Sequence, residues 1–342
     1  MKSVVTKLAI VTTIGFCSIA VAQSPGNNGL SIINNPQLSQ RILGGENAET
    51  VDYPSIVALV APGFASADER LFCGGSLVAE RWVLTAAHCV ISGEIDGVQQ
   101  IRAPASIRVI AGVSDLSQSL STDEVRVSQV ILHPDYDQSE QLPPNDIALL
   151  ELESDTAAAV TTLFTGDTNS YTDSPGYIAG WGAIEYANNF NLIFPTTLQD
   201  AIVPLVSHAE CNAPQSYNGI LADSHLCAGF AEGGVDACLG DSGGPLFITV
   251  DGQQVQAGIV SFGIGCGEPL FYGIYTNISF HIPWLGEFID VPYQSPELVA
   301  LREKSAQPEQ FAAGLDDTDS GRLGYPLFLG LLLLLGVRFR SS

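Results

Sequence analysis

The sequence has 342 residues with 13 Lys and Arg against 37 Asp and Glu, a formal net charge of −24. This acidic excess excludes nucleic acid as an expected partner, because phosphate binding relies on Lys and Arg. Only 15% of the residues are charged and 46% are hydrophobic, so the chain can bury a sizeable core and is not an acidic disordered segment.

The first 22 residues have the layout of a secretory signal peptide. Lys2 and Lys7 form a basic start, residues 8–20 are apolar, and Ala20-Val21-Ala22 fits the small-x-small rule for cleavage. A buried N-terminal helix is the alternative, but the flanks and the length match export better. We therefore expect a secreted or cell-surface protein.

The region from about residue 42 to residue 291 is rich in short apolar stretches with β-branched residues, separated by Gly, Pro, Asn and Asp. Examples are Ser55–Val60, Ile107–Ala111, Val125–Leu132 and Gln256–Phe262. Many short strands between turn residues indicate an all-β barrel or sandwich. One helix is expected near the end of the region, from about His281 to Ile289.

Three segments of this region carry residue types suited to nucleophilic catalysis. The run Thr-Ala-Ala-His-Cys contains His88, Asn-Asp-Ile-Ala-Leu-Leu contains Asp146, and Gly-Asp-Ser-Gly-Gly-Pro contains Ser242. A serine is a poor nucleophile alone; it needs a base, and the base needs an orienting acid. Separately these could be a core histidine, a strand-end acid and a tight turn. Together, in the order His, Asp, Ser, they favour catalysis.

Six cysteines remain when Cys17, inside the predicted signal peptide, is set aside. They are Cys73, Cys89, Cys211, Cys227, Cys238 and Cys266. An exported chain keeps its disulfides, but six cysteines allow fifteen pairings and the residues alone do not choose among them. A zinc site is the competing interpretation, which the lack of any C-x-x-C spacing disfavours.

These motifs resemble the trypsin/chymotrypsin family of serine endopeptidases, and the resemblance covers Ile42 to about Val291. It implies an all-β fold of two six-stranded antiparallel β-barrels with a C-terminal helix. His88 and Asp146 would come from the first barrel and Ser242 from the second.

The resemblance also implies residue roles. Ser242 attacks the scissile carbonyl, His88 takes its proton and later gives it to the leaving amine, and Asp146 holds the imidazole. The N–H groups of Gly240 and Ser242 form the oxyanion hole, and Ser261 supports the buried aspartate. The implied disulfides are Cys73–Cys89, Cys211–Cys227 and Cys238–Cys266.

The segment Arg-Ile-Leu-Gly-Gly, which begins at Arg41, resembles the activation site of the family's zymogens. Cleavage after Arg41 would free the ammonium group of Ile42, which would pair with Asp241 inside the protein and order the oxyanion hole. Residues 23–41 would then be an activation propeptide. The activating enzyme would be a trypsin-like protease or the protein itself.

Substrate specificity is expected to depend on Asp236, six residues before Ser242, because the resemblance puts this carboxylate in the primary pocket. A buried carboxylate prefers a cation, so Arg or Lys would precede the scissile bond. Gly263 and Gly273 match the pocket-wall glycines. Ala237 stands where trypsin has a hydroxyl, so we expect Arg to be preferred over Lys.

Three departures from the family pattern matter. Phe262 replaces the usual Trp beside the site. Val113 stands at the expected place of a calcium-binding Glu, so no metal is expected there. Tyr272 precedes a pocket-wall glycine, as in relatives that bind sodium, so Na⁺ near Tyr272 is the one cofactor considered. The other histidines are expected to be solvated or structural: His133, His208, His225 and His281.

The end of the chain predicts an anchor. Residues 292–322 contain scattered Pro and an Asp pair and are expected to form a linker. Residues 323–342 begin with 15 consecutive uncharged residues, Leu323 to Val337, which are followed by Arg338-Phe339-Arg340. As a helix, this run spans about 22 Å, short of a hydrocarbon core of roughly 30 Å. It resembles bacterial GlyGly-CTERM sorting tails, so it would be a membrane or sorting helix, kept or removed by a sorting protease.

The sequence therefore predicts a secreted, zymogen-activated endopeptidase acting on protein or peptide substrates after Arg or Lys. A catalytically inactive relative used as a binding protein is the rival. Such relatives usually lose a triad residue or the activating terminus, and His88, Asp146, Ser242 and Ile42 are all present. The physiological substrate and the oligomeric state are not predicted.

Overall fold

A computed structural model describes residues 42–95, 98–156, 158–187 and 191–291. The predicted signal peptide, propeptide, linker and apolar tail lie outside these ranges. None of the helices within them is both long and apolar enough to cross a membrane.

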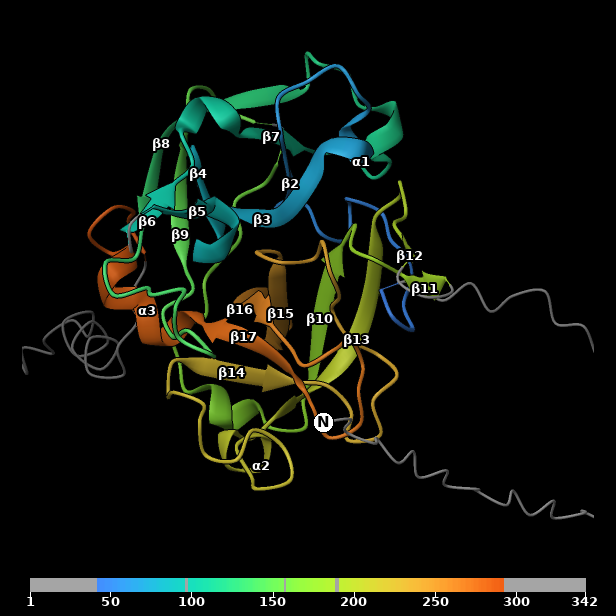
Figure 1. The fold of residues 1–342 in the computed structure, drawn as a ribbon, viewed down its shortest axis with the longest axis vertical. Helices are drawn as coiled ribbons and strands as arrows, with labels where there is room; N and C mark the ends of the chain where they lie inside the picture. The colour runs from blue at the N-terminus through green and yellow to red at the C-terminus, as the bar shows by residue number, and fades with distance from the viewer. Residues whose placement is uncertain (1–41, 96–97, 157, 188–190, 292–342) are drawn as a thin grey trace, which may run out of the picture.

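The first half of the described chain closes into an antiparallel barrel of six strands, in the order β2-β3-β4-β9-β8-β7 (Figure 1). The strands are β2 (Ile56–Val60), β3 (Leu71–Ala79), β4 (Trp82–Thr85), β7 (Arg108–Ala111), β8 (Glu124–Leu132) and β9 (Ala148–Leu152). Fully buried side chains such as Val57, Leu59, Val83 and Leu149 fill its interior. Burial of these β-branched and Leu residues accounts for the short apolar stretches in the sequence.

The second half forms another ring of six antiparallel strands, in the order β13-β10-β15-β16-β17-β14, which pairing of β13 with β14 closes. The strands are β10 (Pro175–Gly180), β13 (Gln199–Val206), β14 (His225–Ala228), β15 (Pro245–Val250), β16 (Gln253–Phe262) and β17 (Gly273–Asn277). The two-residue strand β1 (Glu46–Asn47) adds to the outer edge of β13. The two six-stranded barrels expected from the resemblance are confirmed.

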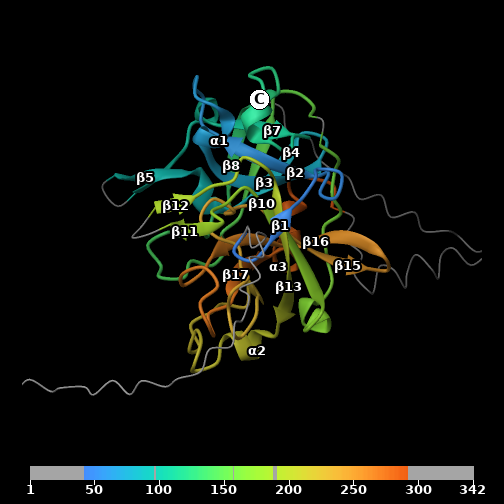
Figure 2. The same cartoon turned by 90° about the vertical axis from the view of Figure 1, so that its right-hand side faces the viewer.

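Two hairpins project from the same side of the molecule (Figure 2). One consists of β5 (Ile91–Ile95) and β6 (Val98–Ile101), directly after the segment with His88. The other consists of β11 (Glu185–Ala187) and β12 (Asn191–Ile193). The shorter helical turns are α1 (Ala67–Arg70), α2 (His208–Cys211), η1 (Ala87–Val90), η2 (Pro104–Ser106), η3 (Leu116–Gln118) and η4 (Thr168–Tyr171).

The C-terminal helix α3 spans Ile278–Leu285, whereas the sequence predicted about 281–289. It begins earlier because Asn277, the last residue of β17, caps it: the Asn277 Oδ1 accepts from the Ser279 N–H at 3.2 Å. Its apolar side packs into the core of the first barrel, although the helix follows the second (Figure 1). The helix therefore ties the two barrels together.

Three disulfides form with the pairing that the resemblance implies. Cys73–Cys89 joins β3 to η1, Cys211–Cys227 joins α2 to β14, and Cys238–Cys266 joins the Ser242 loop to the segment after β16. Such cross-links restrict the unfolded chain and are typical of proteins that fold in oxidising compartments.

Candidate active site

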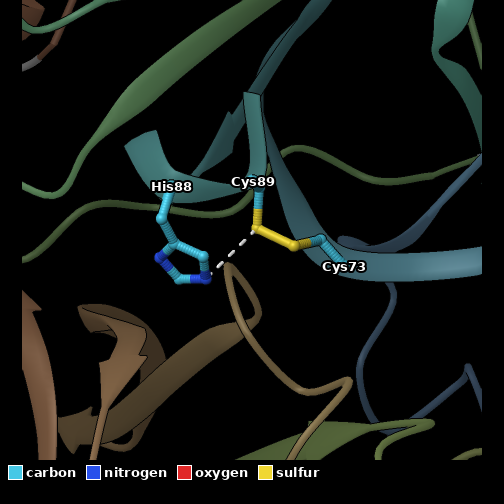
Figure 3. A group of neighbouring side chains, drawn as sticks. All are labelled: Cys73, His88 and Cys89. Carbon is cyan, nitrogen blue, oxygen red and sulfur yellow. Dashed lines mark hydrogen bonds between the residues drawn. A yellow bond between two sulfur atoms is a disulfide. The ribbon is translucent and has the colours of Figure 1, made fainter. Parts of the chain in front are cut away.

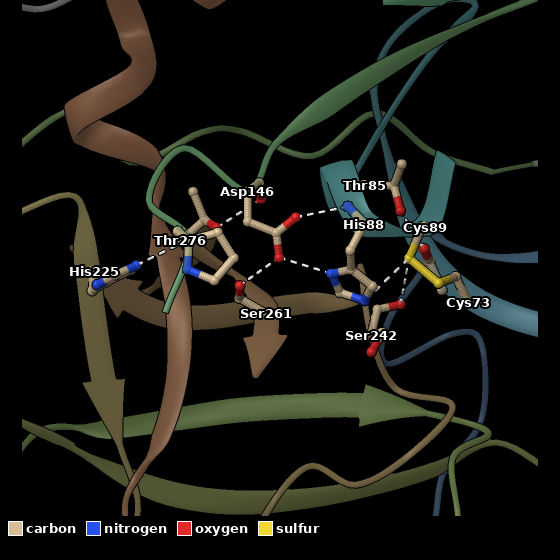
Figure 4. Close-up of polar contacts among 11 residues, drawn as sticks. Cys73, Thr85, His88, Cys89, Asp146, His225, Ser242, Ser261 and Thr276 are labelled. Atoms are coloured by element: carbon tan, nitrogen blue, oxygen red, sulfur yellow. Dashed lines mark hydrogen bonds and ion pairs between the residues drawn. A yellow bond between two sulfur atoms is a disulfide. The ribbon is translucent and has the colours of Figure 1, made fainter. Parts of the chain in front are cut away.

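His88 is held in place by its neighbours in both sequence and space. It lies in η1, directly after β4, and the next residue is tied to β3 by the Cys73–Cys89 disulfide. Its backbone N–H donates to Asp146 Oδ1 at 2.8 Å, and its ring Nδ1 lies 2.7 Å from Asp146 Oδ2 (Figure 4). This double contact fixes both the backbone and the ring of His88 against one carboxylate.

Asp146 is buried at the boundary between the barrels, with 2% of its surface exposed. It precedes β9 of the first barrel, yet two of its partners come from the second. The Ser261 hydroxyl donates to Asp146 Oδ2 at 2.5 Å, and the Thr276 hydroxyl donates to the Asp146 carbonyl at 2.7 Å. Every carboxylate contact is therefore a hydrogen-bond donor, which favours the ionised form.

The two groups change each other's acidity. Burial by itself would lower the pKa of His88, but the charge and hydrogen bond of Asp146 outweigh it, so the net pKa is raised. Burial by itself would raise the pKa of Asp146, but His88 and the Ser261 hydroxyl more than offset it, so the net pKa is lowered. A carboxylate that stays charged beside an imidazole can orient the ring and stabilise its protonated form.

Ser242 lies beside the His88 ring, in the turn between Cys238 and β15 (Figure 4). Its carbonyl accepts from the Gly74 N–H at 2.8 Å, which attaches this turn of the second barrel to β3 of the first. The Cys89 Sγ lies 3.8 Å from His88 Nε2 and 3.6 Å from the Ser242 carbonyl oxygen. The free ring nitrogen and the Ser242 segment thus meet at the barrel boundary.

The turn around Ser242 depends on glycine at position 243. Gly243 has a φ of +79°, and a Cβ there would clash with the Thr85 hydroxyl oxygen and come within 2.6 Å of the Gly74 carbonyl oxygen. Only a residue without a side chain permits this conformation and this close approach. Within the described residues, the N–H groups of Gly240 and Ser242 have no hydrogen-bond acceptor. They are therefore available to a ligand.

A cavity of about 320 Å³ opens at Ser242. Asp236, Ala237, Gly263 and Gly273 all line it, so the structure brings together the residues expected to form the primary pocket. A Cβ on Gly273 would lie 2.6 Å from Asp236 Oδ1. The glycine therefore leaves the carboxylate accessible from the cavity.

The carboxyl group of Asp236 is buried and only partly satisfied. Its Oδ2 accepts from the Gly267 N–H at 3.0 Å, while its Oδ1 has no partner among the described residues. Burial raises the pKa of Asp236 to about 7, and its backbone hydrogen bonds offset only part of this effect. The buried hydroxyl of Tyr275, which also lines the cavity, has no partner within the described ranges either. Orphaned buried acceptors of this kind suit a ligand that brings hydrogen-bond donors and positive charge.

Asp241 is a second buried carboxyl, 2% exposed. Its oxygens accept from the N–H groups of Gly182 at 2.8 Å and Cys238 at 3.0 Å. Burial raises the pKa of Asp241 to about 6, and none of the ion pairs in the described part of the chain includes it. The side chain of Ile42 is fully buried in the core of the second barrel, whereas Arg41 lies outside the described residues.

Cys73, His88 and Cys89 place three possible metal-ligand atoms within 4.8 Å of one another (Figure 3). The two cysteines are joined in a disulfide, whereas a metal ligand must be a thiolate. This cluster therefore does not fit a metal ion, and its role is to hold η1. Tyr272, the residue considered for sodium, is buried, and its hydroxyl donates to Glu210 Oε1 at 3.0 Å. Sodium binding stays a prediction.

Some residues of the site have no signal in the sequence. Thr276 and Tyr275 occupy neighbouring positions of β17, where buried β-branched and aromatic residues are ordinary. His225 was expected to be solvated or structural; it is 3% exposed and its Nε2 lies 3.3 Å from the carbonyl oxygen of Pro143, in the loop before Asp146. Only the pairing of distant strands reveals these contacts.

Comparison with known proteins agrees with this geometry. The family model described as Trypsin matches residues 42–285. Trypsin-1 of Astacus astacus is 36% identical over 220 residues, 63% of this chain and 86% of that protein. Coagulation factor IX of Cavia porcellus is 35% identical over 252 residues, 71% of this chain and 80% of that protein. Transmembrane protease serine 5 of Homo sapiens is 37% identical over 254 residues, 72% of this chain and 51% of that protein. The chain belongs to the trypsin family and is a serine endopeptidase.

Proposed function

We propose that this endopeptidase cleaves protein substrates after Arg, and less efficiently after Lys, through a triad of Ser242, His88 and Asp146. The observation that supports this specificity is the buried Asp236 carboxylate, whose Oδ1 lacks a partner in the described chain. Asp236 lines the same cavity as Ser242. A guanidinium group would satisfy both the charge and the empty acceptor.

The proposed chemistry follows from the pair of contacts at Asp146. Asp146 holds the proton of His88 on Nδ1, which leaves Nε2 as the base that takes the Ser242 hydroxyl proton during attack. The resulting imidazolium is stabilised by the adjacent carboxylate and then protonates the leaving amine. Water repeats the sequence on the acyl-enzyme, and the proton again passes through His88.

The negative oxygen of the tetrahedral intermediate would be bound by the N–H groups of Gly240 and Ser242. Both lack an acceptor among the described residues, and both belong to the turn that Gly243 makes possible. Donors that are already oriented before reaction stabilise the developing charge, and one such donor is worth about 3 kcal/mol in the barrier.

The preference for Arg over Lys rests on Ala237, which borders the cavity but offers no hydroxyl. The Lys ammonium is compact and strongly hydrated, so it needs more acceptors near Asp236 than the broad guanidinium group. We expect A237S to raise kcat/KM for Lys relative to Arg about fivefold, because one added hydrogen bond is worth roughly 1 kcal/mol. Matched Arg and Lys amides give this ratio. A237G, which adds no acceptor, should leave the ratio as it is, and an equal shift in both variants would contradict the explanation.

We also propose activation by cleavage after Arg41. The support is that Ile42 is fully buried in the second barrel while Asp241, buried in the same half of the molecule, has no cationic partner among the described residues. A new ammonium group on Ile42 would supply that partner. The ion pair would then hold the turn that contains Asp241 and Ser242 in one conformation.

The uncleaved protein should be less stable at pH 8 than at pH 5 on account of Asp241. A carboxyl whose pKa is raised by folding stabilises the fold below its unfolded pKa, near 4, and this contribution is lost as the pH rises through about 6. About half of the full effect of roughly 3 kcal/mol falls between these two pH values, so the expected loss is about 1.5 kcal/mol. Urea unfolding of the uncleavable R41Q chain at both pH values measures it. Adding D241N, which cannot ionise, should reduce the drop; an unchanged drop would contradict the assignment.

The division of the chain outside the described residues is part of the proposal: a signal peptide at 1–22, a propeptide at 23–41, a linker at 292–322 and an anchor or sorting tail at 323–342. Intact-mass measurement of the native protein tests each boundary. A mass that includes residues 1–41 would contradict the proposed maturation, and a mass without residues 323–342 would mean that the tail is removed.

The central experiment is a peptide library varied at the residue before the scissile bond, digested by the activated protein. Cleavage after Arg, and more slowly after Lys, is the expected result. Cleavage after apolar residues instead would overturn the proposed specificity while leaving the endopeptidase class intact.

A further inference from the structure

His225 is a buried histidine that the proposed reaction does not use. It lies at the start of β14 in the second barrel and is 3% exposed. Its Nδ1 accepts from the Ala222 N–H at 3.1 Å, so the ring proton is on Nε2. Nε2 then donates to the Pro143 carbonyl at 3.3 Å (Figure 4). The two nitrogens thus join the second barrel to the loop that ends in Asp146.

Before Asp146, that loop has few hydrogen bonds besides those of Asn145, whose side chain donates to the Asp135 carbonyl at 3.3 Å and whose carbonyl accepts from the Ile147 N–H at 2.8 Å. Pro143 and Pro144 have no N–H to donate, and within the described residues His225 is the sole donor to the Pro143 carbonyl. Asn145 follows with a φ of +59°, a left-handed conformation that Asn adopts more readily than most residues but that still costs some energy relative to the common backbone regions. Asp146 comes next. A strained residue beside the carboxylate keeps its conformation only if the chain on both sides is fixed.

His225 also supports the other wall of the site. Its ring packs edge-on against Phe262, with ring centroids 5.3 Å apart and an interplanar angle of 89°. Phe262 directly follows Ser261, the donor to the Asp146 carboxylate. Pro143 and Phe262 both line a cavity of about 440 Å³ beside His88. The His225 side chain therefore contacts two segments that position Asp146. One is the strand of the second barrel that contains Ser261 and Phe262, and the other is the loop that leads into Asp146.

We propose that His225 is a positioning residue, which holds the Pro143–Asp146 loop so that the Asp146 carboxylate stays against His88 Nδ1. This inference rests on the triad proposed above. Without the Nε2 donor, the Pro143 carbonyl can move, and the loop can relax its strain at Asn145. The carboxylate would then be displaced and its contact with His88 weakened. A misplacement of about 1 Å in a catalytic group is enough to lower kcat.

The charged and titratable groups that face His225 are Asp146 and His208. Burial lowers the pKa of His225; its bond to Pro143 and the charge of Asp146 oppose this effect, and His208 adds to it. The histidine therefore stays neutral at neutral pH, with one nitrogen as acceptor and the other as donor. Both hydrogen bonds require this neutral form.

Two nearly isosteric substitutions separate these bonds. H225Q places an amide near the position of Nε2 and keeps a donor for Pro143, whereas H225N places its amide near Nδ1 and cannot reach Pro143. We expect kcat on an Arg amide to fall about fivefold in H225N, the usual effect of losing one hydrogen bond, and less than about twofold in H225Q. Benzamidine inhibition should be unchanged in both, because Asp236 is not touched.

The pH profile distinguishes positioning from a general loss of stability. The acid limb of kcat/KM reports the free-enzyme pKa of the catalytic base, and Asp146 raises that pKa in His88. H225N should therefore shift the acid limb to lower pH, whereas H225Q should leave it in place. A protein that is merely less stable would show a lower Tm with the acid limb unmoved.

A third variant keeps the test decisive if H225N does not fold. H225F retains an aromatic ring against Phe262 but has neither nitrogen, so it should match H225N in kcat and in the acid limb. Wild-type kcat and an unmoved acid limb in whichever of H225N and H225F folds would overturn the positioning role. If the wild-type protein itself cleaves no Arg or Lys substrate, the proposed specificity fails, and the comparison is then made on whichever peptide the wild type does cleave.

Discussion

S242A is expected to lower kcat on an Arg amide by about 10⁴- to 10⁶-fold while leaving the fold intact. The Ser242 hydroxyl is the nucleophile that forms the acyl-enzyme. In S242A a water molecule would have to attack instead, and it is not held in the orientation that the hydroxyl has. The Gly74–Ser242 contact involves backbone atoms only, so the turn keeps its attachment to β3. Benzamidine inhibition constants and Tm, measured beside kcat, should match the wild type.

Two comparisons sharpen this result. S154A removes an exposed hydroxyl of the first barrel and should leave kcat unchanged. H88A should lower kcat by a factor similar to that of S242A, and the double variant should lower kcat little further. The effects of residues that act as one unit are not additive. Additive losses would mean that Ser242 and His88 do not share one step, and would contradict the triad.

D236N is expected to lower kcat/KM for Arg and Lys substrates by about 10²- to 10⁴-fold, since breaking a buried charge pair costs about 3–5 kcal/mol. The substrate cation would enter a cavity in which no described side chain carries the opposite charge, because the other lining residues are neutral. D251N, which changes an exposed acid in the turn between β15 and β16, has the same change in net charge and should have no comparable effect.

The same carboxyl predicts how cation binding depends on pH. Asp236 must lose its proton to pair with a cation, and burial raises its pKa to about 7 in the empty cavity. Benzamidine affinity should therefore rise as the pH increases from 5 to 7 and then level off, with proton release near pH 6. Affinity that is equally pH-dependent in D236N would assign the titration to another group.

The scarcity of basic residues fits the proposed specificity. From Val127 to Leu301 the chain contains no Lys or Arg, so an enzyme that cuts after these residues finds no site there in itself. Two of the five arginines between residues 42 and 291, Arg70 and Arg126, form ion pairs with Glu124 and Glu153. The same negative net charge that disfavours binding of nucleic acid would attract substrates with cationic side chains.

The sequence alone determined those features that local pattern encodes. Short β-branched stretches predict strands such as β8, whose observed start differs from the predicted Val125 by one residue. The motifs around His88, Asp146 and Ser242 predict the residues of the site through their resemblance to one family. The bounds of α3 were wrong because its start depends on the Asn277 cap, which is also the end of a strand.

Only the tertiary structure decided how these residues act on one another. His88 and Asp146 are 58 positions apart and meet because the barrel closes, and Thr276 and His225 reach the Asp146 loop because the second barrel packs against the first. Burial, which no local pattern encodes, raises the pKa of Asp236 and Asp241 and leaves Asp236 Oδ1 without a partner in the described chain. The sequence identifies the reacting groups, whereas their burial away from water determines their pKa values and which of their atoms remain unpaired.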